Sequence, residues 1–547
     1  MRPAAALAIV ALLSGGHAAM AKPKARRTPP AASAPTPTPE LHAAVTRGPD
    51  GWRADPELDG PLLGWALTRG PDGLRTLHVL VGSKRGDAPP DSAAPCAGPD
   101  AAGGAKRDAR LYRWSVDAPD RLVAEGSDLP SGSLESADLD GNGEDELLLV
   151  RDGAIDLVSR SADGAATLRA LAADASFGKS CCGPRLAWDD AASQDPVVRL
   201  EFPGAFRTYR ALAHGGLAVV SEQAIPKRVA AAGERMSVSS PPVRAIGKSA
   251  SGRMLFATEP EAAGKRRLRT SLLDPDAPRE SQTLESWALF PGAERVVDTS
   301  FSFLGGDPVL VVTTTSGDKL SLLGEKGLRV FPLSGDRTRA GVAPLFAATT
   351  GINLWQEANP SVVDLDRDGR DDLVLAYWKG LKNAIAALEV YRGGAAPVLS
   401  KGRSMSIDVE GGAKGFIAFG PDLDGDGRPD LTLLAKGELV VFPGTAPEKA
   451  VDRPVDTKPS RRVAVPAGLP TAQRSSFSMG TGGFEISRSA GGLGTPHFLD
   501  LDGDVRPELI FAGDAAAGVG RVVVVFVRGG TSVAPSSTIS RGMVTPG

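Results

Sequence analysis

The sequence predicts an all-β protein built from repeated units. Glycine (65 residues) and proline (44) are plentiful and aromatic residues make up only 5% of the 547-residue chain. This balance favours many short strands joined by turns over long helices. A chain of this length is too long for one simple core unless its architecture is repetitive. An acidic motif occurs four times, and each copy leads directly into a short apolar segment. We therefore expect repeated strand-forming units.

The four acidic copies share one spacing. They read ADLDGNGEDELLLV from Ala137, VDLDRDGRDDLVLA from Val363, PDLDGDGRPDLTLL from Pro421 and LDLDGDVRPELIFA from Leu499. Counted from the first Asp of each copy, oxygen-bearing side chains stand at positions 1, 3, 5 and 9. In chain order these are Asp138, Asp140, Asn142 and Glu146; Asp364, Asp366, Asp368 and Asp372; Asp422, Asp424, Asp426 and Asp430; and Asp500, Asp502, Asp504 and Glu508.

Short oxygen ligands at alternate positions of a tight turn are typical of a calcium site. Calcium takes six to eight oxygen ligands, whereas magnesium keeps several waters and fits this pattern less well. Position 7 would add only its backbone carbonyl, from Glu144, Arg370, Arg428 and Arg506. Acidic turns also occur without a metal, but four copies with one spacing favour a bound cation.

Two further positions refine this interpretation. An EF-hand needs a bidentate Glu at position 12, and here position 12 is Leu149, Leu375, Leu433 or Phe511, so an EF-hand is excluded. Glycine fills position 6 in the first three copies, where we expect a positive φ. The fourth copy has Val505 there, which predicts a distorted, weaker or empty site.

The four loops resemble the calcium loops of FG-GAP/VCBS repeats, the blades of the integrin-α-like β-propeller family. Phe419-Gly420, before the third loop, matches the name motif. The resemblance implies a β-propeller of four-stranded antiparallel blades. In four of these blades a calcium loop of the pattern DxDxDGxxD would join two strands.

The spacing of the loops predicts the number of blades. Asp364 and Asp422 are 58 residues apart, and the interval from Asp138 to Asp364 is about four such steps. Three blades without intact loops are therefore expected, near 188–202, 246–258 and 301–315. Seven blades is the favoured count. Eight is the alternative, if the strands at 61–82 and 109–117 form a blade of their own rather than complete the last one.

The ends of the chain predict an exported protein. Residues 1–21 have the charged start, apolar segment and small-residue cleavage site of a signal peptide. The apolar segment is too short to span a membrane. Residues 22–45 are expected to form a disordered Pro/Ala-rich linker and 46–530 the propeller. We expect a flexible insertion at about 446–490 and a disordered tail at 531–547. The periplasm, cell surface and extracellular space are all open destinations.

The three cysteines allow more than one pairing. We favour a disulfide from Cys96 to Cys181 or Cys182, and the alternatives are a vicinal Cys181–Cys182 bond or three unpaired thiols. A metal site at the cysteines is disfavoured because no histidine accompanies them.

No catalytic motif was found. The histidines are scattered, and His497 is interpreted as a strand-end residue rather than a base. The basic segment that contains Arg266, Arg267 and Arg269 fits a solvated hairpin face better than an anion site. The net charge of −3 gives no reason to expect nucleic acid or an anionic membrane as partner.

These observations favour a non-catalytic, calcium-stabilised propeller that binds an unknown protein or glycan. A scaffold role in an envelope assembly is a related possibility. The alternative from another class is a secreted polysaccharide lyase or hydrolase that uses the channel face.

Overall fold

The computed structural model describes most of residues 40–527. The residues in this span that are not described are 57, 83–106, 141, 152–153, 161–164, 174–185, 188–196, 203–204, 212–216, 225–242, 249–252, 259, 263–265, 275–276, 278–282, 291–293, 317–324, 334–341, 354–355, 357, 380–384, 395–398, 410–412, 466–473, 481–482, 490–496, 505 and 515–519. The chain divides into Met1–Thr38 and Pro39–Gly547, and the described residues all belong to the second unit. The expected signal peptide, the tail at 531–547 and all three cysteines lie outside the described residues.

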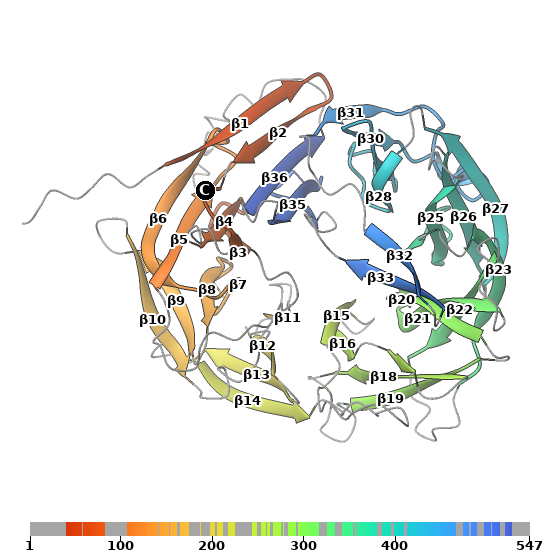
Figure 1. The fold of residues 1–547 in the computed structure, drawn as a ribbon, viewed down its shortest axis with the longest axis horizontal. Coiled ribbons are helices and arrows are strands. Elements are labelled where there is room, and N and C mark those ends of the chain that lie inside the picture. Colours follow the sequence, from red (N-terminus) through yellow and green to blue (C-terminus); the bar gives the residue numbers. More distant parts are fainter. Residues whose placement is uncertain are drawn as a thin grey trace, which may run out of the picture. The chain divides into compact units, whose positions relative to one another are not determined.

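The second unit is a β-propeller of antiparallel sheets that follow one another around a ring (Figure 1). The strand pairings among the described residues give eight four-stranded blades, here named A to H. Blade A contains β3 (Leu62–Arg69), β4 (Arg75–Val81), β5 (Arg107–Trp114) and β6 (Arg121–Pro130). Blade B contains β7 (Ser133–Ala137), β8 (Glu146–Arg151), β9 (Ala154–Arg160) and β10 (Ala166–Ala173). Blade C contains β11 (Leu186–Ala187), β12 (Val197–Phe202), β13 (Ala205–Ala211) and β14 (Leu217–Ala224).

Blades D to G continue in the same order. Blade D contains β15 (Val243–Lys248), β16 (Met254–Thr258), β18 (Arg267–Leu273) and β19 (Thr283–Leu289), with the short β17 (Glu261–Ala262) paired to β18. Blade E contains β20 (Glu294–Leu304), β21 (Asp307–Ser316), β22 (Glu325–Pro332) and β23 (Phe346–Asn353). Blade F contains β24 (Ala358–Val363), β25 (Asp372–Lys379), β26 (Ile385–Gly393) and β27 (Leu399–Asp408). Blade G contains β28 (Ala413–Phe419), β29 (Leu431–Ala435), β30 (Glu438–Phe442) and β31 (Arg461–Ala464).

Blade H combines both ends of the described chain. Its first three strands are β34 (His497–Leu499), β35 (Glu508–Asp514) and β36 (Gly520–Val527), and its fourth is β2 (Gly51–Pro56). β1 (Leu41–Gly48) pairs with β2 and also with β6 of blade A. The ring is therefore closed by strand pairing between segments from opposite ends of the propeller.

The blade count follows from this closure. The strands near 61–82 and 109–117 form the complete blade A, and blade H is completed by β2 instead. The alternative of eight blades is thus the one that the pairings support, and the favoured count of seven was one too few. The three expected blades without intact loops correspond to blades C, D and E.

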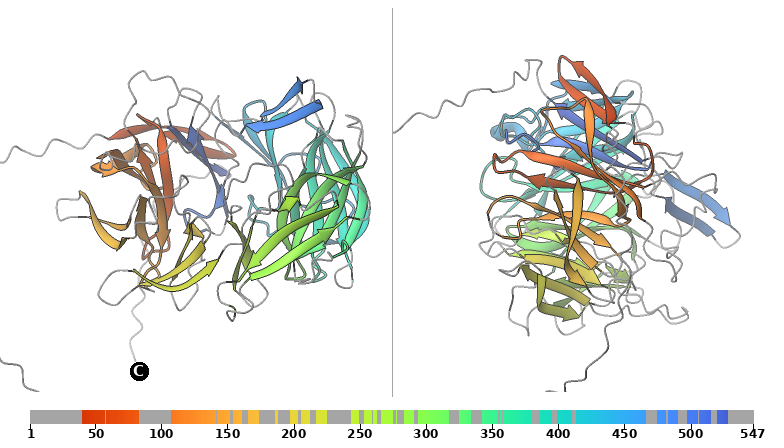
Figure 2. Two further views of the ribbon diagram at one scale, coloured as in Figure 1. Left: turned by 60° about the horizontal axis from the view of Figure 1, so that its bottom comes forward. Right: turned by 90° about the vertical axis from the view of Figure 1, so that its left-hand side faces the viewer.

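Two expected boundaries were wrong. The first strand begins at Leu41, inside the expected linker 22–45, because β1 has partners in two blades. The segment 446–490 is not simply a flexible insertion. It contains the one-turn helix α1 (Pro447–Ala450) and β31, which is the outer strand of blade G. It also contains a hairpin of β32 (Arg474–Gly480) and β33 (Gly483–Ser489), which lies apart from the eight blades in Figure 2.

The core consists of apolar layers between neighbouring blades, as β25 illustrates. Leu373, Leu375 and Tyr377 pack with residues of blade E, whereas Val374 and Ala376 pack with residues of blade G. Alternate side chains of a strand point to opposite faces, so a blade between two others must be apolar on both. The apolar segment that follows the second acidic copy is therefore a strand buried on both faces.

An aromatic stack stabilises the seam of the ring, where β2 pairs with β36. Trp52 of β2 is only 6% exposed, and its ring lies parallel to that of Phe526, with 4.0 Å between the ring centroids. Arg521 of β36 also forms an ion pair with Asp55 of β2, at 2.6 Å.

We expect Trp52→Ala to lower the free energy of unfolding by about 3–5 kcal/mol, because it leaves a cavity at the seam. Denaturant unfolding followed by circular dichroism would measure this loss. Trp52→Phe, which keeps a ring on Phe526, should lose clearly less. Equal losses in the two variants would show that the stack does not fasten the seam.

Candidate metal sites

The four acidic loops occupy equivalent places in four blades. Residues 138–146, 364–372, 422–430 and 500–508 join the first and second strands of blades B, F, G and H, and we name them loops B, F, G and H. The leucines at positions 2 and 10 of every loop are buried, as an anchoring role requires. They are Leu139, Leu365, Leu423 and Leu501 at position 2, and Leu147, Leu373, Leu431 and Leu509 at position 10.

Hydrogen bonds from the backbone shape each loop around its own side chains. In all four loops the position-2 N–H donates to the position-9 carboxylate, over 2.6–3.1 Å. The position-7 N–H donates to the position-5 side-chain oxygen, over 2.6–3.0 Å. In loops B, F and G the position-6 N–H also donates to the position-1 carboxylate. The loop backbone is thereby folded around its carboxylates.

Glycine at position 6 has the predicted backbone conformation. Gly143, Gly369 and Gly427 have φ values of 88°, 83° and 77°. Only glycine adopts this region readily, because it has no Cβ. Val505, the residue in the fourth loop that led us to expect a distorted site, lies outside the described residues.

The loops bring three carboxylate oxygens together in each blade. The oxygens of each group lie within 4.8 Å of one another. In loops B, F and G the groups come from positions 1, 3 and 9, whereas in loop H they come from positions 1, 3 and 5. The groups are Asp138, Asp140 and Glu146; Asp364, Asp366 and Asp372; Asp422, Asp424 and Asp430; and Asp500, Asp502 and Asp504.

Some predicted ligands lie outside these groups. Asp368 and Asp426 are absent from them, and so is Glu508, which accepts the N–H of Leu501 over 2.7 Å. Asn142 uses its side-chain oxygen to accept the N–H of Glu144. The carbonyl role of position 7 stays a prediction. The backbone N–H of each position-7 residue donates to position 5.

The donor set fits a hard divalent cation. All the grouped atoms are carboxylate oxygens, which calcium prefers. Two oxygens bound to one calcium ion at 2.3–2.6 Å are at most about 5 Å apart, and the oxygens of each group lie closer together than this limit. The clusters could therefore hold a metal ion.

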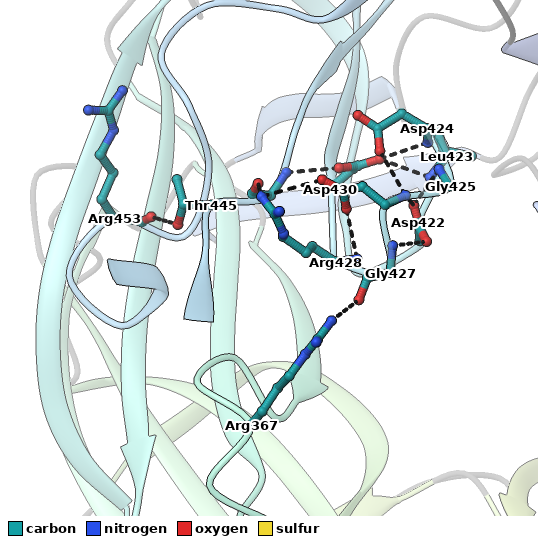
Figure 3. Close-up of polar contacts among 12 residues, drawn as sticks. Arg367, Asp422, Leu423, Asp424, Gly425, Gly427, Arg428, Asp430, Thr445 and Arg453 are labelled. Atoms are coloured by element: carbon teal, nitrogen blue, oxygen red, sulfur yellow. Dashed lines mark hydrogen bonds and ion pairs between the residues drawn. The ribbon is translucent and has the colours of Figure 1, made fainter. Parts of the chain in front are cut away.

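The position-9 carboxylate connects its loop to the rest of the blade. Asp372 and Asp430 are 1% and 0% exposed. One oxygen of each accepts the N–H of its own loop, and the other accepts the N–H of Gly393 or Gly444, at the end of the third strand, over 2.7 and 2.9 Å. Figure 3 shows the contacts around Asp430. A Cβ at Gly393 would lie only 2.4 Å from the Asp371 carbonyl oxygen, so this approach requires glycine.

Burial and mutual repulsion raise the pKa of several carboxyl groups in these loops. Burial, with repulsion from Asp424 next, raises the pKa of Asp430 to about 7. Burial also raises the pKa of Glu146, Asp372 and Asp424, and repulsion from other carboxylates of the same loop adds to the effect. A cation between the oxygens would offset both penalties.

Contacts between loops of neighbouring blades were not predicted. Asp371, at position 8 of loop F, accepts the N–H of Gly305 in the first turn of blade E, over 2.7 Å. Asp145, at position 8 of loop B, likewise accepts the N–H of Arg69 in blade A, over 2.7 Å. The sequence signal was an acidic residue at position 8 in only two copies, next to the predicted ligands.

Two other hydrogen bonds connect neighbouring blades, one between loops F and G and one between loop H and the first turn of blade A. Arg367 of loop F donates to the Gly427 carbonyl of loop G, over 2.8 Å (Figure 3). The Arg75 N–H of blade A donates to the Leu501 carbonyl of loop H, over 3.0 Å. The loops therefore contact one another across blade boundaries.

The remaining candidate residues have structural partners. His497 is the first residue of β34, as predicted, and its ring packs edge-on against Trp65. Arg266 donates to the Phe290 carbonyl, and Arg269 pairs with Glu285 and lies over the Trp287 ring. Arg267 lies over the same ring. These three arginines pack on the blade D hairpin.

One series of polar side-chain contacts, from Thr68 through His78 to Glu125, was not predicted. Thr68 Oγ1 lies 2.9 Å from His78 Nε2, and His78 Nδ1 lies 3.1 Å from Glu125 Oε2. Glu125 also pairs with Arg160 of blade B and lies 3.4 Å from Arg113. His78 is only 5% exposed, so the series is buried where blades A and B meet.

Comparisons with known proteins do not identify a family. No family model and no curated protein matches the sequence. Among solved structures, a protein from Lactobacillus plantarum shares 12% identity, over 79% of this chain and 97% of that chain, with a TM-score of 0.29. The dihydro-heme d1 dehydrogenase NirN in complex with DHE shares 13%, over 78% and 73%, with a TM-score of 0.38. The S. cerevisiae core factor shares 8%, over 74% and 60%, with a TM-score of 0.31. At these scores the similarities carry no functional argument, and the propeller assignment rests on the strand pairings.

The charge of Asp424 should matter only when a cation is present. In chelator, we expect Asp424→Asn to be at least as stable as the parent protein, because burial and Asp426 disfavour the charged form in the fold. In calcium, the variant should lose stability of roughly 1–3 kcal/mol relative to the parent, because one ligand charge is gone.

Thermal unfolding in calcium and in chelator would measure both differences. Asp408→Asn, an exposed position on β27, is the matched control and should change neither. A loss for Asp424→Asn that is the same in calcium and in chelator would contradict the assignment of this residue as a ligand.

Proposed function

We propose that the chain is an exported, calcium-stabilised and non-catalytic β-propeller of the FG-GAP/VCBS type, which binds a protein or glycan partner. One observation carries the calcium assignment. Four loops at equivalent places in four blades each gather three carboxylate oxygens within 4.8 Å. A similar group of carboxylates, repeated at equivalent places of one architecture, supports a common ligand better than four unrelated acidic turns would.

Calcium in this proposal is a structural component. Extracellular calcium modules bind with dissociation constants of about 10⁻⁴–10⁻³ M, so such sites are filled where calcium is abundant. The buried position-9 carboxylates connect the loops to the blades, and the loops contact each other between blades. An ion in each loop would therefore stabilise both the blade and its junctions.

Removal of calcium should lower the melting temperature. At 10 mM calcium, each site of this affinity contributes about 1.4–2.7 kcal/mol, so chelator should lower the melting midpoint by at least a few degrees. Differential scanning calorimetry would measure the shift. Re-addition of calcium should restore the midpoint, and equimolar magnesium should restore less. A midpoint unaffected by chelator would refute the calcium assignment.

Export and a non-catalytic role are further parts of the proposal. Residues 1–21 support export through their signal-peptide pattern. No helix in the described part of the chain is long and apolar enough to cross a membrane. The Thr68–His78–Glu125 series has the order of a hydroxyl–imidazole–carboxylate relay, but Glu125 is neutralised by arginines and His78 is buried. We interpret the series as a junction of blades A and B.

A partner should be captured in a calcium-dependent way. The proposal predicts that the immobilised propeller retains a discrete protein or glycan from envelope extract in calcium, and releases it in chelator as the loops lose order. A pull-down analysed by mass spectrometry, with a glycan array beside it, would test this. The Asp424→Asn variant should retain less of the same partner. Turnover of a polysaccharide substrate would favour the enzyme alternative instead.

A further inference from the structure

We propose that a pocket between loops F and G binds an acidic side chain of a protein partner. The cavity has a volume of about 240 Å³ and lies between blades F and G. Its polar lining includes Arg367, Arg428 and Thr445, and its apolar lining includes Val363, Leu365 and Pro447. The proposal rests on the proposed function as a binding module and specifies the chemistry of the partner.

The size and walls of the pocket favour one amino-acid side chain. Pockets for drug-sized ligands are about 300–1,000 Å³, so this cavity fits a smaller group. Its aliphatic walls suit the methylene stem of Glu or Asp. A sugar unit carries a hydroxyl on most of its carbons, and several of these would lie unsatisfied against Val363, Leu365 and Pro447.

The donors in the pocket favour a carboxylate. A guanidinium has five N–H groups. Among the described residues, Arg367 uses one nitrogen to donate to the Gly427 carbonyl over 2.8 Å. Arg428 donates to the Gly444 carbonyl over 3.2 Å and lies 3.5 Å from Asp426. The other N–H groups of the two arginines can form the paired, charge-assisted hydrogen bonds that arginine makes with carboxylates.

The acidic residues in the lining are already engaged. Asp364 and Asp422 are position-1 residues that accept N–H groups of their own loops. Each also belongs to an oxygen group that could hold a cation. A divalent cation in each loop would offset part of the negative charge of these carboxylates, and the guanidinium groups of Arg367 and Arg428 supply donors in the lining.

Backbone strain at Arg367 supports a role for its side chain. Arg367 has a φ of 59°, in the left-handed region that disfavours residues with a Cβ. The same position 4 is glycine in loops G and H, where Gly425 and Gly503 have φ values of 81° and 75°. Strained residues of this kind concentrate at ligand clamps and active sites. In loop F the strain places a guanidinium at the pocket, and the bond to Gly427 holds it there (Figure 3).

The pocket can be tested with short peptides. The probe is a fluorescein-labelled Gly/Ser peptide with one central Glu, compared with its Gln counterpart by fluorescence anisotropy in millimolar calcium. We expect the Glu peptide to bind the full-length protein about tenfold more tightly, since one charge-assisted pair is gained. Arg367→Gly should reduce this preference to less than about threefold.

The variants separate a lost pocket from a lost fold. Arg367→Gly loses the hydrogen bond to Gly427 but also relieves the strained backbone by copying the glycine of loops G and H, so its melting temperature and calcium-induced shift should stay close to those of the parent protein. Arg403→Ala is the matched control, because Arg403 is an exposed arginine of the same blade, paired with Asp452. It should keep the full preference for Glu. If Arg367→Gly does not fold, Arg428→Gln provides the same test from the other side of the pocket.

Each result that contradicts the expectation rejects either the pocket proposal or the calcium assignment. Equal binding of the Glu and Gln peptides, or an unchanged preference in Arg367→Gly, would overturn the pocket proposal. So would competition by glucuronate that is stronger than competition by N-acetylglutamate, because the occupant would then be a glycan. The peptide-binding results are measured independently of the thermal unfolding in calcium and in chelator. A normal calcium shift without Glu preference rejects only the pocket, whereas Glu preference without a calcium shift rejects only the calcium assignment.

Discussion

The structure depends on a buried carboxylate in the loop between the first two strands of a blade. Asp372 and Asp430 each use one oxygen for their own loop and the other for the end of the third strand. Each residue thereby joins three strands. Burial of this charge beside other carboxylates is costly, as the raised pKa of Asp430 shows. The contact that organises the blade therefore also places a carboxylate where a bound cation would offset the cost of burial.

The same loops connect the blades to one another. Where position 8 is acidic, as in Asp371 and Asp145, it accepts an N–H from the first turn of the preceding blade. Loop G has Pro429 at this position, and the junction is made instead by Arg367, which reaches over from loop F. Different side chains thus form the contact between the loops of neighbouring blades. Any ion that orders a loop also orders the junctions next to it, so its effect extends beyond a single blade.

The sequence predicted what depends on local pattern. The turn at each acidic copy, the strand that follows it and the positive φ of Gly369 follow from turn chemistry and strand periodicity. The blade count and the ring closure did not, because β2 and β36 pair across almost the whole chain and no local signal marks the partners. The role of Asp371 was missed for the same reason, since its hydrogen-bond partner, Gly305, lies 66 residues away.

Blade H, where the ring is closed, combines both kinds of contact. At its outer edge β2 pairs with β36, and Trp52 stacks on Phe526. On the loop side, the Leu501 carbonyl of loop H accepts the N–H of Arg75 in blade A. The outer fastening combines backbone pairing, the aromatic stack and the Arg521–Asp55 ion pair, and it needs no bound metal ion. The contact on the loop side depends on the order of loop H. The chain itself runs from β2 of blade H into β3 of blade A, so the break between the two ends of the propeller lies inside blade H, between β36 and β2. A cation in loop H would therefore order the blade in which segments from both ends of the described chain are joined by strand pairing and side-chain contacts rather than by a connecting loop.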